Sequence, residues 1–148
     1  MVAFKNILVP IDFSEGSEKA LEYAKQVCEK KDVLIHLLHS VEPAVYPADW
    51  SYSRVNFAQL EAELLATSVK ELEVLAGKLR SEGYTVESEV TTGRGSEVII
   101  AYSKIKNIDL ICISTHGRKG FDHFLFGSTT EKVLRKAECP VLVVRIKD

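Results

Sequence analysis

The sequence contains no hydrophobic run long enough to cross a membrane, since its longest apolar stretches have only the length of a β-strand. It has no excess of basic residues either, because 19 Lys and Arg stand against 21 Asp and Glu, for a formal net charge of −2. This balance argues against nucleic-acid binding, which needs a basic surface. Residues 1–12, MVAFKNILVPID, make a poor signal peptide and a good first strand, because the run ends at Pro10 and Asp12. We therefore expect neither a membrane nor a nucleic acid as a partner.

Cysteine is scarce, odd in number and widely spaced, with Cys28, Cys112 and Cys139 the three present. These positions fit neither a disulfide framework nor a zinc site. Free thiols are typical of a reducing compartment, so we expect a cytoplasmic protein. With 46% hydrophobic and 27% charged residues, the chain suits one soluble domain, 1–148, with one sizeable core.

Two common phosphate-binding motifs are absent. No G-x-G-x-x-G follows the first apolar segment, which disfavours a dinucleotide-binding fold. No G-x-x-x-x-G-K-[ST] is present to form a Walker-type phosphate loop. Gly93-Arg94-Gly95 is too short for either motif and is interpreted as a turn that leads into a helix.

Apolar segments of strand length alternate along the chain with segments of helical spacing. The predicted strands are 4–11, 33–41, 84–90, 110–113 and 141–146, with helices in the four intervals, the longest over 54–81. This alternation predicts an α/β fold, a five-stranded parallel sheet in the order 3-2-1-4-5 with helices on both faces. Segment 84–90 alternates polar and apolar residues, which indicates an edge strand, and 42–53 is irregular.

Capping residues and apolar stripes indicate where the predicted helices begin and which of their faces is buried. Ser14 or Ser17 can cap the first helix. Leu60 and Leu64 belong to the apolar stripe of the long helix, and Leu134 is expected to face inward from the last one.

The most informative stretch is 109–131, DLICISTHGRKGFDHFLFGSTTE. An apolar strand leads into a loop rich in Gly, Lys, Arg and His, and then into a helix whose start has the capping-box spacing of Ser128 and Glu131. Glycines let backbone N–H groups approach a ligand, and a helix N-terminus adds donors and a favourable dipole, so the stretch suits an anion. Many connections between a strand and a helix contain glycines, so a purely structural loop is the alternative.

Two polar residues follow the strands that would flank a ligand crevice. In the order 3-2-1-4-5 the strand order reverses between the first and fourth strands, and ligands bind outside the carboxyl ends of the strands at that point. Asp12 follows the first strand and Ser114 follows the fourth. The Asp12 carboxylate can accept hydrogen bonds from ribose hydroxyls, or alternatively can cap the helix that begins near Ser14.

Three segments extend this pattern: KNILVPIDFSE (5–15), ICISTHGRKG (111–120) and FGSTTEKVLRKAECPVLVVR (126–145). Together they resemble the universal stress protein family over essentially the whole chain. The resemblance implies the five-stranded α/β fold inferred above. It also implies ATP binding in the crevice by the motif G-x2-G-x9-G-[ST], which many members of the family carry.

One position departs from that motif. The second glycine is Gly117 and the third is Gly127, followed by Ser128, but Ser114 stands where the first glycine would be. If the position needs a positive φ or a very close approach to phosphate, Ser114 weakens binding. If it needs only a small residue, Ser114 serves and can donate a hydrogen bond.

The resemblance also implies a place for each part of the nucleotide. Asp12 would lie near the ribose. Pro10 and Val41 would lie around the adenine. Ser128 and Thr129 would lie at the phosphates.

The loop adds candidate phosphate contacts of its own. Arg118 and Lys119 are added because of their charge, with solvated loop residues as the alternative, and His116 could contact phosphate or pack. The full predicted site is Pro10, Ile11, Asp12, Val41, Ser114, His116, Gly117, Arg118, Gly127, Ser128 and Thr129.

No Cys, His or Asp spacing matches a metal site, so Mg²⁺ or Mn²⁺ is expected only together with ATP, through its phosphates. Ser128, His116 and Asp12 are candidates for hydrolysis, but their spacing marks no triad. By resemblance alone, enzymatic activity would be at most slow ATP hydrolysis or autophosphorylation.

The last strand is predicted to pair with a second copy of the chain. Residues 141–144 read VLVV, and a long apolar edge without lysine or proline promotes aggregation unless it is paired. A homodimer through edge strand 141–146 is the simplest solution, and the family resemblance implies the same.

Three functions are compatible with these observations. The first is a nucleotide-dependent regulatory protein of the stress response, which the matches at Asp12, Gly117 and Gly127 favour. The second is a dimeric interaction module that binds no nucleotide, which Ser114 favours. The third is a slow ATP hydrolase, for which no catalytic set is recognisable.

Overall fold

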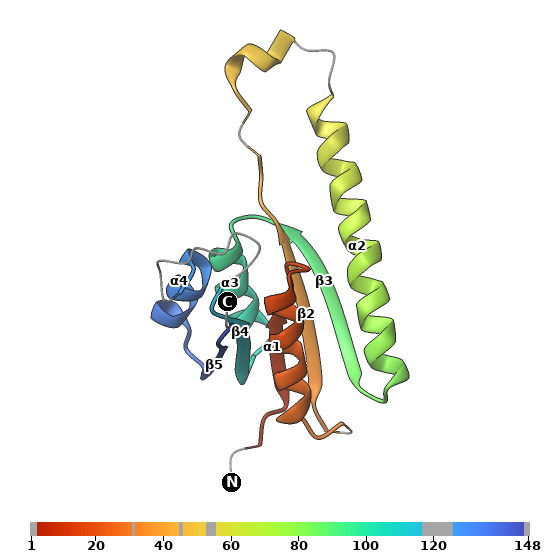
Figure 1. The fold of residues 1–148 in the computed structure, drawn as a ribbon, viewed down its shortest axis with the longest axis vertical. Coiled ribbons are helices and arrows are strands. Elements are labelled where there is room, and N and C mark those ends of the chain that lie inside the picture. Colours follow the sequence, from red (N-terminus) through yellow and green to blue (C-terminus); the bar gives the residue numbers. More distant parts are fainter. Residues whose placement is uncertain (1–2, 31, 45, 53–55, 117–125, 147–148) are drawn as a thin grey trace.

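Five parallel strands alternate with four α-helices in the described part of the computed structural model, which covers residues 3–146 except 31, 45, 53–55 and 117–125 (Figure 1). The strands are β1 (Asn6–Pro10), β2 (Leu34–Val41), β3 (Thr85–Thr92), β4 (Leu110–Ser114) and β5 (Val141–Val144). The α-helices are α1 (Glu15–Gln26), α2 (Phe57–Ser81), α3 (Gly95–Ile105) and α4 (Ser128–Lys136), and a 3-10 helix, η1, spans Ala48–Tyr52. None of these helices is long and apolar enough to span a bilayer.

The strands form one sheet in the order β3-β2-β1-β4-β5, with every neighbouring pair parallel. The predicted fold and strand order are therefore confirmed. The order reverses between β1 and β4, so the carboxyl ends of these two strands lie at the point where open α/β sheets bind ligands.

Helices cover both faces of the sheet, as predicted, because alternate residues of a buried strand point to opposite faces. On one face β1 packs against α1 and α2, with Ile7, Val9, Ala20, Leu21, Leu72, Ala76 and Leu79 buried together. On the other face the sheet packs against α3 and α4, with Leu8, Ile99, Tyr102, Ile111, Ile113 and Val133 buried together. Leu134 was expected to face inward, but its side chain is 39% exposed, while the neighbouring Val133 is fully buried in the core.

β3 is an edge strand, as its alternating pattern predicts. Val86 is buried while Thr85 and Glu87 are exposed, so one face of the strand packs and the other is wet. The long helix α2 covers the buried side.

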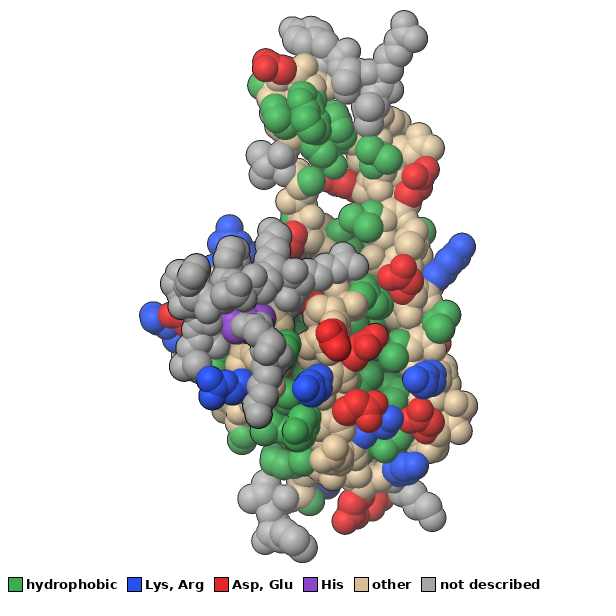
Figure 2. Space-filling view, viewed as in Figure 1, with side chains coloured by type: hydrophobic (Ala, Val, Ile, Leu, Met, Phe, Trp, Pro, Cys, Tyr) green, Lys and Arg blue, Asp and Glu red, His purple; other side chains and the backbone are tan. Residues whose placement is uncertain are grey.

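α2 is longer than the sheet that it covers. In Figure 1 its first half, together with the segment that carries η1, projects beyond the carboxyl ends of the strands. Leu60 and Leu64, which share the apolar stripe, are accordingly 47% and 54% exposed. Figure 2 shows hydrophobic side chains gathered on this projecting part. The apolar stripe of α2 thus extends along the helix beyond the point where the sheet ends.

Stacked aromatic rings hold the projecting part together. The ring of Tyr46 stacks on that of Phe57 with centroids 3.9 Å apart, and Trp50 stacks on Phe57 at 6.0 Å. Segment 42–53, predicted to be irregular, contains the short 3-10 helix η1, and α2 begins at Phe57 rather than at 54. The side chain of Asn56 caps α2 by accepting a hydrogen bond from the Gln59 N–H at 3.1 Å.

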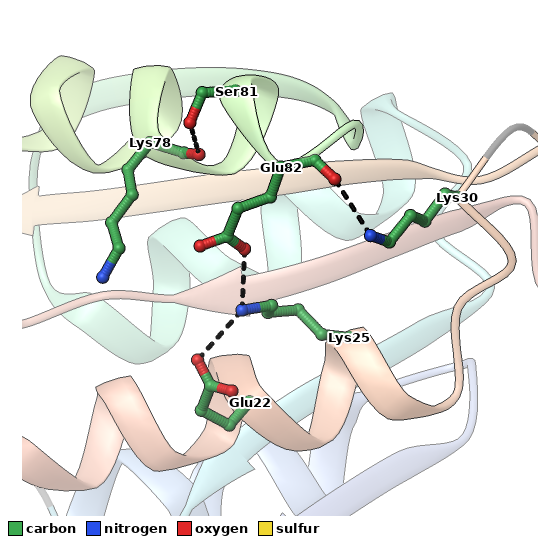
Figure 3. Close-up of polar contacts among 6 residues, drawn as sticks. All are labelled: Glu22, Lys25, Lys30, Lys78, Ser81 and Glu82. Atoms are coloured by element: carbon green, nitrogen blue, oxygen red, sulfur yellow. Dashed lines mark hydrogen bonds and ion pairs between the residues drawn. The ribbon is translucent and has the colours of Figure 1, made fainter.

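An ion-pair network joins α1 and α2 at the other end of the sheet (Figure 3). The ammonium group of Lys25 lies 3.2 Å from the Glu22 carboxylate and 2.9 Å from that of Glu82. Lys30 donates to the backbone carbonyl of Glu82 at 2.9 Å. The hydrogen bond with Glu82 raises the pKa of Lys25. These contacts fix the amino ends of the strands, far from the carboxyl ends where the predicted site lies.

Candidate functional site

The β1–α1 connection places Asp12 at the carboxyl end of β1. Its Oδ1 accepts a hydrogen bond from the Ser14 N–H at 3.0 Å and another from the Ser14 hydroxyl. Ser14 in turn caps α1, because its Oγ accepts from the Ser17 N–H at 3.2 Å. Of the two predicted caps, Ser14 is therefore the one used. Asp12 orients the capping residue, and this contact also fixes its carboxylate at the end of the strand.

The same connection contains a strained residue that the sequence did not reveal. Phe13 has a φ of 62°, in the left-handed region that a bulky side chain rarely adopts. Its ring packs against that of His39, with centroids 4.8 Å apart. His39 Nδ1 donates to the Ile11 carbonyl at 2.6 Å, so β2 holds the connection in place from the side. Strained backbone of this kind often marks a functional site.

The carboxyl end of β4 presents Ser114, which is 6% exposed. Its hydroxyl donates to the carbonyl of His116 at 2.8 Å, so it is engaged within the loop. Ser114 is not among the described residues with a positive φ, which are Phe13 and Asn107 outside glycine. The backbone at this position therefore does not require glycine, which removes one reason for Ser114 to weaken binding.

α1 packs closely against the end of β4 through Gly16. A Cβ added to Gly16 would lie 2.8 Å from the carbonyl oxygen of His116 and 2.9 Å from the hydroxyl of Ser114, and it would also collide with Ile146. Only glycine leaves room for this approach. The contact brings the N-terminus of α1, beside Asp12, against the β4 loop.

α4 begins where the loop returns to β4. The Gly127 N–H donates to the Thr115 carbonyl at 2.7 Å, and the buried Thr130 hydroxyl donates to the Ser114 carbonyl at 2.7 Å. These two bonds fix the first turn of the helix against the end of the strand. Since Gly127 is the N-cap, no capping side chain occupies the N–H groups that open the helix.

The predicted capping box at Ser128 is wrong. Gly127 is the N-cap and Ser128 is the first helical residue, because the Glu131 N–H donates to the Gly127 carbonyl at 3.0 Å. The Glu131 carboxylate instead accepts from Arg135 at 2.7 Å, one turn further along the helix. The Ser128 side chain is exposed at the helix start rather than used as a cap.

A second helix N-terminus, which the prediction did not include, lies next to that of α4. The Gly95 N–H at the start of α3 donates to Oε1 of Glu42 at 3.3 Å. A Cβ on Gly95 would lie 3.7 Å from the Thr129 hydroxyl and 3.8 Å from the same Glu42 oxygen. The interpretation of 93–95 as a turn before a helix was correct, but its proximity to Thr129 is visible only in the fold.

Val41 connects this region to β2. It is the last residue of β2, and its carbonyl accepts a hydrogen bond from the Gly93 N–H at 3.0 Å. Gly93 has a φ of 151°, and a Cβ there would lie 2.8 Å from a methyl of Val98, so the turn requires glycine. Val41 thus lies at the carboxyl edge beside the turn that leads to Gly95.

The described members of the predicted site all lie at one edge of the sheet. A hydrogen bond joins the Ser114–His116 segment to Gly127, and close packing at Gly16 joins the same segment to the α1 N-terminus beside Asp12. His116 Nδ1 lies 3.2 Å from the Thr115 hydroxyl. Gly117, Arg118 and Lys119 lie outside the described residues.

A cavity of about 320 Å³ adjoins this edge, between the segment after β2 and the first half of α2. Its lining residues are mostly apolar, with the carboxylates of Glu42 and Glu61 among them. Val41 lines it, and so connects the predicted adenine site to the base of the projecting part.

A metal centre and an ionised thiol would be two further reactive features of such a site. Among the described residues, no group of three or more His, Cys, Asp or Glu could hold a metal ion. Burial raises the pKa of the Cys112 thiol to about 12 and also raises that of Cys28 and of Cys139. These thiols therefore stay protonated near neutral pH and are poor nucleophiles.

Comparisons with known proteins agree with this fold. The model of the universal stress protein family matches residues 3–145. Universal stress protein A homolog 2 of Coxiella burnetii is 33% identical, with 97% of each chain covered. Universal stress protein MJ0531 of Methanocaldococcus jannaschii is 30% identical over 96% of this chain and 82% of its own. The solved structure of MJ0577 from the same archaeon superimposes with a TM-score of 0.86, at 30% identity and 99% coverage of both chains. The chain belongs to the universal stress protein family.

Proposed function

We propose that this protein binds ATP or another adenine nucleotide at the carboxyl ends of β1 and β4 and acts as a nucleotide-dependent regulator in the stress response. One observation carries the proposal: the start of α4 is fixed against the end of β4. The Gly127–Thr115 and Thr130–Ser114 hydrogen bonds fix it there. These bonds support the proposal because they hold a helix N-terminus at the carboxyl end of β4, one of the two strands between which the strand order reverses.

The phosphates would bind at the start of α4. Its opening N–H groups have no capping side chain, and the helix dipole favours negative charge there. The hydroxyls of Ser128 and Thr129 stand in the same turn and can donate to phosphate oxygens. His116, Gly117 and Arg118 would complete the phosphate side by their place in the loop.

The nucleoside would bind closer to β1 and β2. A carboxylate at the position of Asp12 can accept hydrogen bonds from ribose hydroxyls while it orients Ser14. Pro10, Ile11 and Val41 end the two strands with apolar side chains against which adenine can pack.

Solved structures of the same fold support adenine nucleotides as the ligand class. A universal stress protein in complex with cAMP has a TM-score of 0.71, and an Arabidopsis thaliana family protein with AMP bound has one of 0.69. These proteins are 17% and 19% identical to this chain, so what they share with it is the fold. cAMP, AMP and ATP have adenosine in common. This favours recognition through the residues proposed to contact the nucleoside rather than through the loop proposed to contact the phosphates. With ATP, Mg²⁺ or Mn²⁺ would be held through the phosphates.

Regulation is favoured over catalysis because no catalytic set is recognisable in the sequence. Asp12 belongs to the β1–α1 connection, and His116 and Ser128 belong to the β4–α4 connection. Their spacing in the sequence marks no catalytic triad. Slow hydrolysis or autophosphorylation would be a side activity of a binding protein. A homodimer through β5 and a cytoplasmic location complete the proposal.

Calorimetric titration of ATP with Mg²⁺ into protein stripped of nucleotide tests the proposal. We expect saturable binding that is lost in Asp12→Ala and in Gly127→Val. A Cβ at residue 127 already lies 3.4 Å from the Thr115 carbonyl, so the valine methyls must displace the loop. Asp32→Ala, at the opposite end of the sheet, and Gly77→Val, where a Cβ has no neighbour within 4 Å, are matched controls that should bind as the parent does. Absence of heat at millimolar ATP would leave the dimeric interaction module as the better function.

A further inference from the structure

We infer that Glu42 makes nucleotide binding depend on a divalent cation, so that the crevice selects the magnesium complex of ATP over metal-free ATP. This inference rests on the proposed function, since it concerns the phosphate side of the same site. Glu42 is not part of the nucleotide motif, and it directly follows Val41 at the end of β2.

The fold places the Glu42 carboxylate beside the proposed phosphate position. Its Oε1 accepts a hydrogen bond from the Gly95 N–H at 3.3 Å. That oxygen and the Thr129 hydroxyl both lie within 4 Å of a single point, the position at which a side chain on Gly95 would begin. A negative charge therefore stands next to the first turn of α4.

Two features keep the carboxylate in this position. The N-terminus of α3 favours an anion through its dipole and its N–H groups. Gly95 has no side chain, so no Cβ occupies the point that lies 3.8 Å from the Glu42 oxygen and 3.7 Å from the Thr129 hydroxyl. Glu42 is 53 residues away from Gly95 in sequence, so this contact is a product of the fold.

No cation in the described structure compensates this charge. Glu42 makes no ion pair with any described residue. The nearest basic residue in sequence to Gly95 is Arg94, whose guanidinium lies 3.9 Å from the Glu97 carboxylate of its own helix. A triphosphate at α4 would thus meet a carboxylate that forms no ion pair with the described residues.

Charge repulsion then depends on what accompanies the nucleotide. Metal-free ATP brings several negative charges next to Glu42, which disfavours binding because like charges repel. A magnesium ion on the phosphates cancels part of that charge and can also contact a carboxylate oxygen, the ligand type that it prefers. Adenosine has no phosphate and should be indifferent to Glu42.

The test uses three variants in the full chain. Glu42→Gln keeps the length of the side chain and an oxygen that can accept from Gly95, but it removes the charge. Glu42→Asp keeps the charge. Glu61→Gln removes a charge from the lining of the same cavity, on α2, and is the matched control. Circular dichroism and thermal unfolding establish that each variant is folded.

Affinities for ATP with excess Mg²⁺, for ATP with EDTA and for adenosine are then measured by calorimetry. We expect Glu42→Gln to bind metal-free ATP about 3- to 10-fold more tightly than the parent, on the scale of one like-charge interaction near a surface. Its affinity for adenosine should not change, and Glu42→Asp and Glu61→Gln should resemble the parent. The affinity for ATP with Mg²⁺, divided by the affinity for metal-free ATP, should therefore be lower than in the parent only in Glu42→Gln.

Two other outcomes separate the inference from the proposed function. If the parent binds ATP but the ratio is the same in Glu42→Gln, or falls equally in Glu61→Gln, the inference is wrong and the nucleotide site stands. If the parent binds neither ATP nor adenosine, the proposed function fails and the inference fails with it.

Discussion

The buried hydroxyl of Thr130 donates a 2.7 Å hydrogen bond to the carbonyl of Ser114, and so joins the first turn of α4 to the last residue of β4. The neighbouring residue, Thr129, is directed instead toward Gly95 and Glu42 at the start of α3. Two adjacent threonines thus have different tasks, one in fixing the helix and the other at the proposed phosphate position.

The two threonines should respond differently to valine, which has the same shape. Thr130→Val leaves the buried Ser114 carbonyl without this donor and should lower the free energy of unfolding by about 1–3 kcal/mol. Thr129→Val should weaken ATP binding several-fold and leave stability within about 0.5 kcal/mol of the parent. Urea denaturation and calorimetric titration of both variants measure this contrast. Equal losses of stability in the two variants would contradict the division of tasks.

Gly16 should be intolerant of even a methyl group. A Cβ there meets the His116 carbonyl at 2.8 Å, a backbone atom that cannot rotate away. Gly16→Ala should therefore cost about 1–3 kcal/mol of stability and weaken nucleotide binding by displacing the β4 loop. Gly77→Ala lies in a helix with no neighbour within 4 Å of the new Cβ, and it should stabilise by up to about 1 kcal/mol. A Gly16→Ala variant as stable as the parent would show that the α1–β4 contact is looser than described.

Most of the fold could be predicted from the sequence, because the length of an apolar run and the spacing of its residues indicate which residues are buried. Segments 4–11 and 110–113 are mainly apolar with little alternation and prove to contain central strands, while the alternation in 84–90 marks an edge strand. The ends of the elements were less predictable. The stripe that includes Leu60 and Leu64 has regular spacing beyond the point where the sheet stops, since spacing does not report what faces the helix.

The candidate site shows the same limits. Asp12, Ser114 and Gly127 could be placed from sequence because each follows or precedes a recognisable element. The capping role of Ser128 could not, because the spacing to Glu131 is present while Glu131 pairs with Arg135. The contact of Glu42 with Gly95 joins two loops distant in sequence, and no local pattern reports it.

A buried histidine should make the fold sensitive to acid. His36, 2% exposed, donates from Nε2 to the Asn6 side-chain carbonyl at 3.1 Å and accepts at Nδ1 from the Tyr102 hydroxyl at 2.8 Å. Burial lowers its pKa below the ordinary value of 6.5, although Glu87 partly opposes this shift. The unfolded chain therefore binds the proton first as the pH falls below 6.5. The free energy of unfolding should therefore decrease as the pH falls below 6.5, by up to about 1.4 kcal/mol per pH unit. The decrease should end below the pKa of His36 in the folded state.

Urea denaturation at about pH 7.5 and about pH 5.5 measures this loss. His36→Gln should reduce the difference between the two pH values, because it removes the group that titrates. A His36→Gln protein with the same pH dependence as the parent would assign the effect to other groups.

The outer edge of β5 should form the homodimer. The carbonyls of Pro140 and Val144 accept hydrogen bonds from β4, so the alternate residues, Val141 and Val143, direct their N–H groups away from the sheet. Val143→Pro removes one of these outer donors without breaking a bond to β4, and it should convert the dimer to a monomer. Val143→Thr keeps the N–H and the branched shape and should remain dimeric. Light scattering at micromolar concentration gives the mass, and a monomeric parent would rule out this interface.

The central claim is that the phosphates bind at the N-terminus of α4, and amide chemical shifts report it most directly. Protein labelled with ¹⁵N is titrated with ATP and Mg²⁺ while its assigned amide resonances are followed. The largest changes should fall on Gly127, Ser128 and Thr129, with smaller changes on Asp12 and Val41. Changes confined to the cavity beside α2, or no changes at saturating ATP, would contradict the claim.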